Sequence, residues 1–70
     1  MDRKQVENLG EKIQRLRKDK GLSQDELARK ADIPYTTLTK IEIGVIKKPS
    51  VFVMAKLAKT LGVSIEDIIK

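Results

Sequence analysis

The stretch Ser23–Gly44, SQDELARKADIPYTTLTKIEIG, decides the fold, because its second half fits two different secondary structures. Three threonines and two isoleucines in this half are β-branched, and β-branched residues are enriched in strands. Apolar and polar residues also nearly alternate between Thr39 and Ile43, as they do in a half-buried strand. A pair of strands with its turn at Gly44 is therefore the first alternative.

A proline and an apolar pair favour a helix over the same residues. Pro34 is compatible with the first turn of a helix, since its missing N–H would have no partner there. Leu38 and Ile41 are three residues apart, which places both on one face of a helix. Threonine destabilises a helix by only roughly a few tenths of a kcal/mol relative to alanine, and packing of this pair outweighs that loss. The sequence therefore predicts a helix over about Pro34–Glu42 that ends at Gly44.

The first half of the stretch predicts another helix and then a sharp break. Ser23 and Glu26 form a capping box, in which each side chain accepts a hydrogen bond from the other residue's amide. This helix covers about Gln24–Ala31. Pro34 disfavours the helical conformation for the residue before it, and Asp32 tolerates the left-handed conformation better than most residues do. We therefore expect two short helices joined by a tight turn.

Capping residues and apolar spacing predict three more helices. Gly21 and Gly62 suit the left-handed position after a helix, and Ser50 and Ser64 suit the position before one. The helices are expected over about Lys4–Lys20, over Val51–Leu61, and over a final short segment with Ile65, Ile68 and Ile69. The expected core faces are Val6, Leu9, Ile13 and Leu16 in the first of these and Val51, Met54, Leu57, Ala58 and Leu61 in the second. The sequence thus predicts one all-α domain of five short helices over residues 1–70.

The composition excludes several classes of chemistry. The 70 residues include neither cysteine nor histidine, so disulfides, thiolate metal sites, most zinc sites and serine-type catalytic triads are ruled out. A chain this short also has little room for a substrate pocket. We therefore expect no enzyme, no metal, no cofactor and no small-molecule ligand.

The charge balance favours an anionic partner. Fifteen lysines and arginines against ten acidic residues give a net charge of +5, which suits a polyanion such as nucleic acid. An ordinary charged surface would have the same composition, so charge alone does not decide. No segment approaches the length of a membrane span, and no signal peptide begins the chain. An intracellular, cytoplasmic location is therefore expected, with no membrane partner.

Several ordered motifs make the resemblance to a known family specific. Two helices joined by a tight turn are weak support for a helix-turn-helix, because any helical bundle has short turns. The motifs are RLRKDKGLSQDELA (15–28), TTLTKIE (36–42) followed by Gly44, and PS (49–50) followed by LAKTLGVS (57–64). With these motifs the chain resembles the Cro/phage-repressor, or XRE-type, helix-turn-helix family over about Leu9–Ile69. The resemblance implies a compact lambda-repressor-like DNA-binding domain, with its helix-turn-helix unit at about residues 23–43.

The resemblance also implies which side chains contact DNA. The implied base contacts are Tyr35, Thr36, Thr39 and Lys40, and the implied contacts to the DNA backbone are Gln24, Thr37, Lys47 and Lys48. Threonine offers a base edge both a hydroxyl and a methyl group, and lysines in a loop add affinity that does not depend on sequence. Ordinary solvated helix and loop surface is the alternative for the threonines and lysines. The alternative for Gln24 is a favourable first-turn residue.

Two further sets of residues are expected to be structural. Family members carry an arginine late in the first helix and a glutamate late in the third, which implies a largely buried ion pair of Arg17 with Glu42. If the protein forms a homodimer, the contacts are expected on the last helix, at Ile65, Ile68 and Ile69. Two half-sites would then lie about one DNA turn apart, ~34–36 Å.

One group of apolar residues departs from the family pattern. Positions that are usually polar in the family hold Ile43, Val45, Ile46 and Phe52, and also Val53. Single apolar residues on a surface are common, whereas a joined exposed patch indicates an interaction site. A protein partner, a dimer contact, and contacts with thymine methyls or sugars all remain open for this group.

The resemblance implies a sequence-specific regulator of transcription that binds double-stranded DNA and has no catalytic activity. The helix over Pro34–Glu42 would then contact bases in the major groove. One alternative is a protein-interaction module, such as an antitoxin that masks its partner. Another is an engineered DNA binder on the same scaffold, since the chain has no cysteine, histidine or tryptophan.

Overall fold

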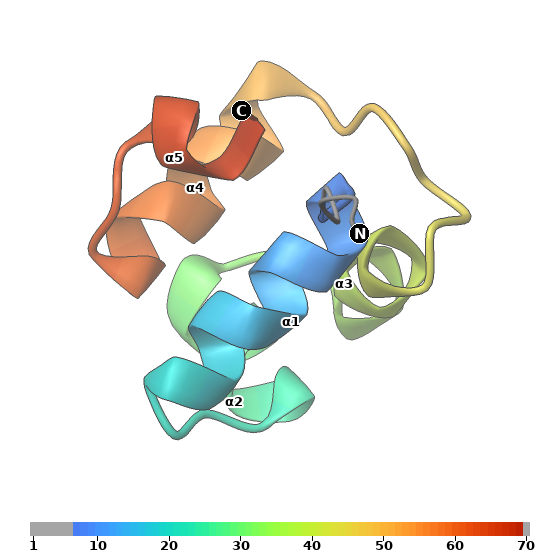
Figure 1. Ribbon diagram of the computed structural model, residues 1–70. Coiled ribbons are helices and arrows are strands. Elements are labelled where there is room, and N and C mark those ends of the chain that lie inside the picture. The colour runs from blue at the N-terminus through green and yellow to red at the C-terminus, as the bar shows by residue number, and fades with distance from the viewer. Residues whose placement is uncertain (1–6, 70) are drawn as a thin grey trace, which may run out of the picture.

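The computed structural model describes residues 7–69, and within that range it has five helices and no strand (Figure 1). The all-α prediction is therefore confirmed. The helices are α1 (Leu9–Asp19), α2 (Gln24–Ala31), α3 (Tyr35–Glu42), α4 (Val51–Leu61) and α5 (Ile65–Ile69). In Figure 1, α1 crosses the middle of the view, with α4 and α5 on one side and α3 on the other. It contacts α3 and α5, while α2 contacts α3 and α4. None of the described helices is long and apolar enough to cross a bilayer.

The ambiguous segment is a helix, and its apolar residues explain why. Leu38 and Ile41 are both 0% exposed, so burial stabilises the helical spacing over the β-preference of the threonines. Pro34 precedes the first helical residue with an extended backbone. Beyond the last turn, Gly44 adopts a left-handed φ of 87°. The helix over Pro34–Glu42 is therefore confirmed to within one residue.

Four of the five helices end in the same way. A residue with a left-handed backbone follows each of them, at Gly21, Asp32, Gly44 and Gly62. In each case the next residue's N–H bonds back to a carbonyl in the last turn, as in the Schellman motif; for α2, the Ile33 N–H donates to Ala28 O at 3.0 Å. Asp32 has a φ of 59°, which is the conformation its residue type was expected to tolerate. Ile33 can therefore turn inward, where it is 7% exposed.

The first helix begins later than predicted. Asn8 caps α1 by accepting from the Glu11 N–H at 2.9 Å, and Glu11 Oε1 accepts from the Asn8 N–H at 3.1 Å. This capping box places Glu7 and Asn8 before the helix, so the predicted start at Lys4 is wrong for these two residues. Lys4 itself and Val6, expected on its apolar face, lie outside the described residues.

The fourth helix buries a slightly different face from the one predicted. Leu57 and Leu61 are in the core as expected, but Val51 is 60% exposed. Val53 packs against the core instead. It lies four residues before Leu57 and eight before Leu61, so all three share one side of the helix. The predictions for Val51 as core and Val53 as surface are both wrong.

One small core joins the helices. Its fully buried side chains are Ile13, Leu27, Leu38, Ile41, Leu57 and Ile68. At Gly10, α1 lies directly against the end of α3: a Cβ there would lie 2.6 Å from Glu42 O and closer still to Ile41 O. Beside this contact, Gln14 Nε2 donates to Glu42 O at 2.8 Å. The backbone at the end of α3 is thus held by α1, which fixes the direction of α3 in the molecule.

Candidate nucleic-acid interface

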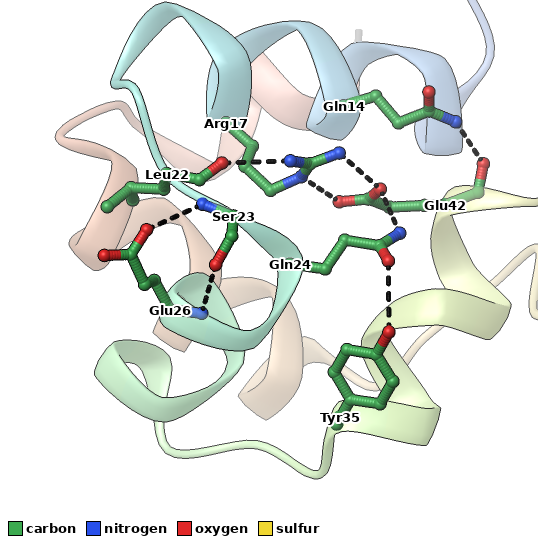
Figure 2. A network of polar contacts seen from close by, with 8 residues as sticks. All are labelled: Gln14, Arg17, Leu22, Ser23, Gln24, Glu26, Tyr35 and Glu42. Atoms are coloured by element: carbon green, nitrogen blue, oxygen red, sulfur yellow. Dashed lines mark hydrogen bonds and ion pairs between the residues drawn. The ribbon is translucent and has the colours of Figure 1, made fainter.

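A buried ion pair joins α1 to the inner side of α3 (Figure 2). Arg17 Nε lies 2.8 Å from Glu42 Oε2, and a second guanidinium nitrogen, Nη2, lies 3.2 Å from Glu42 Oε1. The Glu42 side chain is 1% exposed and that of Arg17 12%. Arg17 Nη1 also donates to Leu22 O at 2.9 Å. Paired nitrogens facing paired oxygens fix orientation as well as distance, so the pair holds α3, α1 and the loop before α2 in one arrangement.

Gln24, at the start of α2, extends this network to the start of α3. Its Nε2 donates to Glu42 Oε1 at 2.9 Å, and its Oε1 accepts from the Tyr35 hydroxyl at 3.4 Å (Figure 2). An amide nitrogen has two hydrogens, and the contact with Glu42 uses one of them. The Gln24 side chain therefore bridges α2 and α3 while it keeps one donor hydrogen for another acceptor.

The outer side of α3 is polar and accessible. Leu38, Ile41 and Glu42 are buried, whereas the side chains expected at bases lie on the other sides of the helix. Tyr35, Thr36 and Lys40 are exposed; Thr37 and Thr39 are half-buried. The structure thus brings the four residues with an expected base contact onto one short, exposed helix next to Gln24.

The loop between α3 and α4 is fastened to the end of α3. The Val45 and Ile46 N–H groups both donate to Lys40 O, at 2.9 and 3.0 Å. Ile46 packs against the core, so the alternative of an exposed apolar patch does not extend to this residue. Lys47 and Lys48 follow it and are exposed. The packing of Ile46 thus fixes the point from which these two lysines extend into solvent.

Three other apolar side chains stay on the surface. Ile43 is 70% exposed, Val45 63% and Phe52 76%. Val51, next to Phe52, is exposed as well. At these positions the structure therefore places apolar side chains on the surface, where the family usually has polar ones.

The last helix has less free surface than was predicted for a dimer contact. Ile68 is 1% exposed and belongs to the domain's own core, which leaves no surface for a second copy. The prediction of a dimer contact at Ile68 is therefore wrong. Ile65 is half-buried and packs on the core, and Ile69 is 55% exposed. Of the three isoleucines, Ile69 offers the most surface.

Comparison with known proteins agrees with this geometry. The sequence model described as helix-turn-helix matches residues 13–68, which is most of the chain. The chain belongs to the helix-turn-helix family. Its predicted resemblance to Cro and phage-repressor proteins is thereby confirmed.

Similar helix-turn-helix proteins are bacterial regulators. The transcriptional regulator SinR of Bacillus subtilis (strain 168) is 34% identical over 61 residues, which are 87% of this chain and 55% of SinR. The chain therefore spans about half the length of the curated relatives it matches. A crystal structure of SinR in complex with DNA has 36% identity and a TM-score of 0.81, over 83% of this chain and 92% of the other. The restriction-modification controller protein C.AhdI from Aeromonas hydrophila has 28% identity and a TM-score of 0.82, over 87% and 91%.

Charged side chains outside α3 are partly committed to each other. Arg15 Nε donates to Glu7 Oε2 at 2.8 Å, and this hydrogen bond holds the pKa of Glu7 below its ordinary value. In the α2 capping box, hydrogen bonding with Ser23 lowers the pKa of Glu26.

Among the described residues there is no group of three or more acidic side chains that could hold a metal ion.

Two positioning residues of this helix-turn-helix domain were not found from the sequence. Gly10 allows α1 to approach the backbone at the end of α3, and the Gln14 side chain donates a hydrogen bond to the Glu42 carbonyl there. A glycine as the second residue of a helix is a visible signal, because glycine there costs stability unless something needs the space. Nothing comparable marks Gln14, whose contact depends on where α3 lies.

Proposed function

We propose that this chain is the DNA-binding domain of a transcriptional regulator, that it recognises specific sequences in double-stranded DNA, and that α3 enters the major groove. One observation carries the proposal. The inner side of α3 is fixed by a buried polar network, while its outer side is exposed and carries no accessible carboxylate. A helix held rigidly from behind presents its side chains to base edges in one register. The similarity to SinR, which has been crystallised in complex with DNA, supports this assignment.

In this arrangement the side chains divide between bases and phosphates. Those facing bases are Tyr35, Thr36, Thr39 and Lys40; those facing phosphates are Gln24, Thr37, Lys47 and Lys48. Gln24 lies at the first turn of α2, where unpaired amides and the helix dipole favour an anion. Phosphate contacts set position and affinity, and base contacts set the sequence. The net charge of +5 agrees with a polyanionic partner.

A homodimer is part of the proposal, because a single short helix contacts only a few base pairs. Ile69 is the exposed apolar residue of α5, with Ile65 beside the core as a lesser contributor. A two-fold dimer would place half-sites about one turn apart, ~34–36 Å. The proposal contains no catalytic step, and the similarity to bacterial regulators supports action in the cytoplasm.

Binding-site selection from a random duplex pool tests the function directly. We expect an enriched motif, palindromic if the protein binds as a dimer. The logarithm of the affinity for it should fall linearly with the logarithm of salt concentration, because bound lysines release counterions from phosphates. A pool without enrichment, together with binding that does not respond to salt, would contradict the proposal.

The exposed residues at the start of α4 favour a second candidate function. Val51 and Phe52 are 60% and 76% exposed, with no role in the core. If these two neighbouring side chains form one exposed apolar patch, it would suit a protein contact. A protein that co-purifies tightly with the chain, while no duplex is enriched, would favour a module that masks a partner. Phe52→Ser should then release that protein.

A further inference from the structure

The outer face of α3 continues one residue beyond the helix, through Ile43. The Ile43 N–H donates to Thr39 O at 3.0 Å, and the backbone angles are φ −90° and ψ 1°. Ile43 therefore keeps the i to i−4 bond of an α-helix. At spacings of three and four, Thr36, Thr39 and Ile43 lie on one side of the helix. Ile43 is 70% exposed, so this apolar side chain extends the accessible face that the threonines begin.

The hydroxyl of Thr39 is already used within the helix. Thr39 Oγ1 donates to Thr36 O at 2.9 Å, so its one hydrogen is not available to an acceptor on a base. The side-chain branch that does not reach the backbone is the methyl group. Thr39 and Ile43 therefore present aliphatic carbon atoms to the major groove. Asn, Gln or Arg at these positions would instead present hydrogen-bond donors.

The charges around this face select its partner. The one acidic residue of α3, Glu42, is 3% exposed, while Lys40 is exposed on the same side as the threonines and Lys47 and Lys48 follow in the loop. A bare apolar face would suit a protein partner, but an apolar strip on a helix whose one carboxylate is buried, with lysines beside it, suits a polyanion that presents methyl groups. In the major groove of DNA, that group is the 5-methyl of a pyrimidine.

We propose that Thr36, Thr39 and Ile43 form a methyl-binding strip that recognises 5-methyl groups of pyrimidines in the major groove. The inference rests on the proposed function, since it requires α3 to lie in that groove. It also assigns a role to Ile43, whose apolar character departs from the family pattern. Thymine and 5-methylcytosine carry the same group, so the chemistry is shared and the source of the methyl is decided by the test below.

Replacing single thymines by deoxyuridine tests the strip, since this removes one methyl group and nothing else. The site is first selected from random duplexes, and each dT of the enriched half-site is then changed to dU. We expect the affinity to fall about threefold to fourfold at each position beneath the strip, the effect of one buried methyl. The dependence of affinity on salt should stay the same, because the phosphate contacts are unchanged.

A second arm of the experiment identifies the source of the methyl group. Each cytosine of the half-site is replaced by 5-methyl-dC, on otherwise unmodified duplexes. A gain in affinity at a cytosine beneath the strip would assign 5-methylcytosine as a ligand beside or instead of thymine. Loss with dU alone would assign thymine.

Protein variants show whether the threonine methyl is the group that acts. Thr39→Ser keeps the hydroxyl and removes the methyl, so the ratio of dT to dU affinity should fall toward one at its position. Thr39→Val removes the hydroxyl and keeps the methyl, so the ratio should persist. The matched control is Thr60→Ser in α4, since Thr60 Oγ1 also donates within its own helix, to Lys56 O at 3.0 Å. Ile43→Ala should remove discrimination at a second position. Helical circular dichroism verifies that each variant is folded.

The outcomes separate this inference from the proposed function. An enriched site whose dU form binds as tightly as its dT form throughout overturns the methyl-binding strip and leaves sequence-specific DNA binding intact. The strip is also overturned if Thr39→Ser keeps the difference between dT and dU affinity while Thr39→Val loses it. In that case the hydroxyl, and not the methyl group, would make the base contact. A pool without any enriched site overturns the DNA-binding function and the strip together.

Discussion

The two sides of α3 differ in how strongly the rest of the molecule constrains them. On the inner side, Glu42 is bonded to Arg17 and Gln24 through its carboxylate and to Gln14 through its carbonyl. On the outer side, Thr36 and Lys40 are exposed. Under the proposed function, stability and recognition therefore depend on different residues of one eight-residue helix. Substitutions on the inner side should lower the free energy of unfolding, and substitutions on the outer side should change only what the protein binds.

The largest effect is expected at the buried ion pair. Arg17→Met leaves the Glu42 carboxylate buried and without its guanidinium, which costs about 3–5 kcal/mol. The free energy of unfolding, measured in urea, should fall by this amount. The double variant Arg17→Met, Glu42→Leu removes both charges and should regain most of the loss. A single variant that loses less than ~1 kcal/mol, as an exposed pair would, would show that the inner side is not anchored here.

Gly10→Ala probes the same anchoring without any charge. Alanine normally stabilises a helix relative to glycine, but here its Cβ would collide with the carbonyls of Ile41 and Glu42. We expect destabilisation of about 1–3 kcal/mol, typical of an overpacked contact. Lys18→Ala, on the exposed side of the same helix, should change stability by less than about 0.5 kcal/mol. If Gly10→Ala were stabilising, α1 and α3 would not approach each other this closely.

On the outer side, Thr36→Ala should separate binding from stability. Its free energy of unfolding should match that of the parent to within about 0.5 kcal/mol, as is usual for an exposed position. Its preferred DNA sequence should change at one or two positions, because a base contact is lost. Selection from a random pool and urea unfolding measure the two effects on the same preparation. A lower unfolding midpoint with an unchanged motif would reverse the assignment of this residue.

The smallest expected effect concerns pH and the start of α2. Hydrogen bonding with Ser23 lowers the pKa of Glu26 from its ordinary value of 4.5. A lowered pKa in the folded state means that Glu26 stabilises the fold above that value and stops doing so as pH falls through the lowered pKa. Glu26→Gln keeps the capping box but cannot titrate, so its stability should depend less on pH in the acid range. Glu66→Gln, at an exposed position in the first turn of α5, is the control.

The sequence was most informative where local chemistry decides structure. The Ser23 capping box, the break before Pro34 and the left-handed Asp32 follow from residue types at fixed spacing, and all are present. The resemblance added the pairing of Arg17 with Glu42, which no spacing could show, because the two residues lie 25 positions apart.

The errors arose where two local signals competed. Apolar spacing continues from Leu9 back to Val6 and predicts an earlier start for the first helix, whereas the Asn8–Glu11 capping box begins α1 at Leu9. In α4 both Val51 and Val53 fit an apolar face, and only packing against the other helices decides between them. Ile68, expected at a dimer contact, is in the core, and Ile46, for which an exposed patch was one open interpretation, packs against it. Such contacts depend on the tertiary arrangement, which a linear pattern does not contain.

The central claim is that α3 recognises bases while the loop after it holds the DNA backbone. Parallel salt titrations of the selected site and a random duplex, with Thr36→Ala and Lys48→Ala, test this most directly. Lys48→Ala should weaken both duplexes alike and reduce the salt slope by about 0.9, the value for one lost phosphate contact. Thr36→Ala should lower affinity for the selected site only, with an unchanged slope. If instead Thr36→Ala weakened both duplexes equally, or Lys48→Ala affected only the selected site, the division of roles between helix and loop would be wrong.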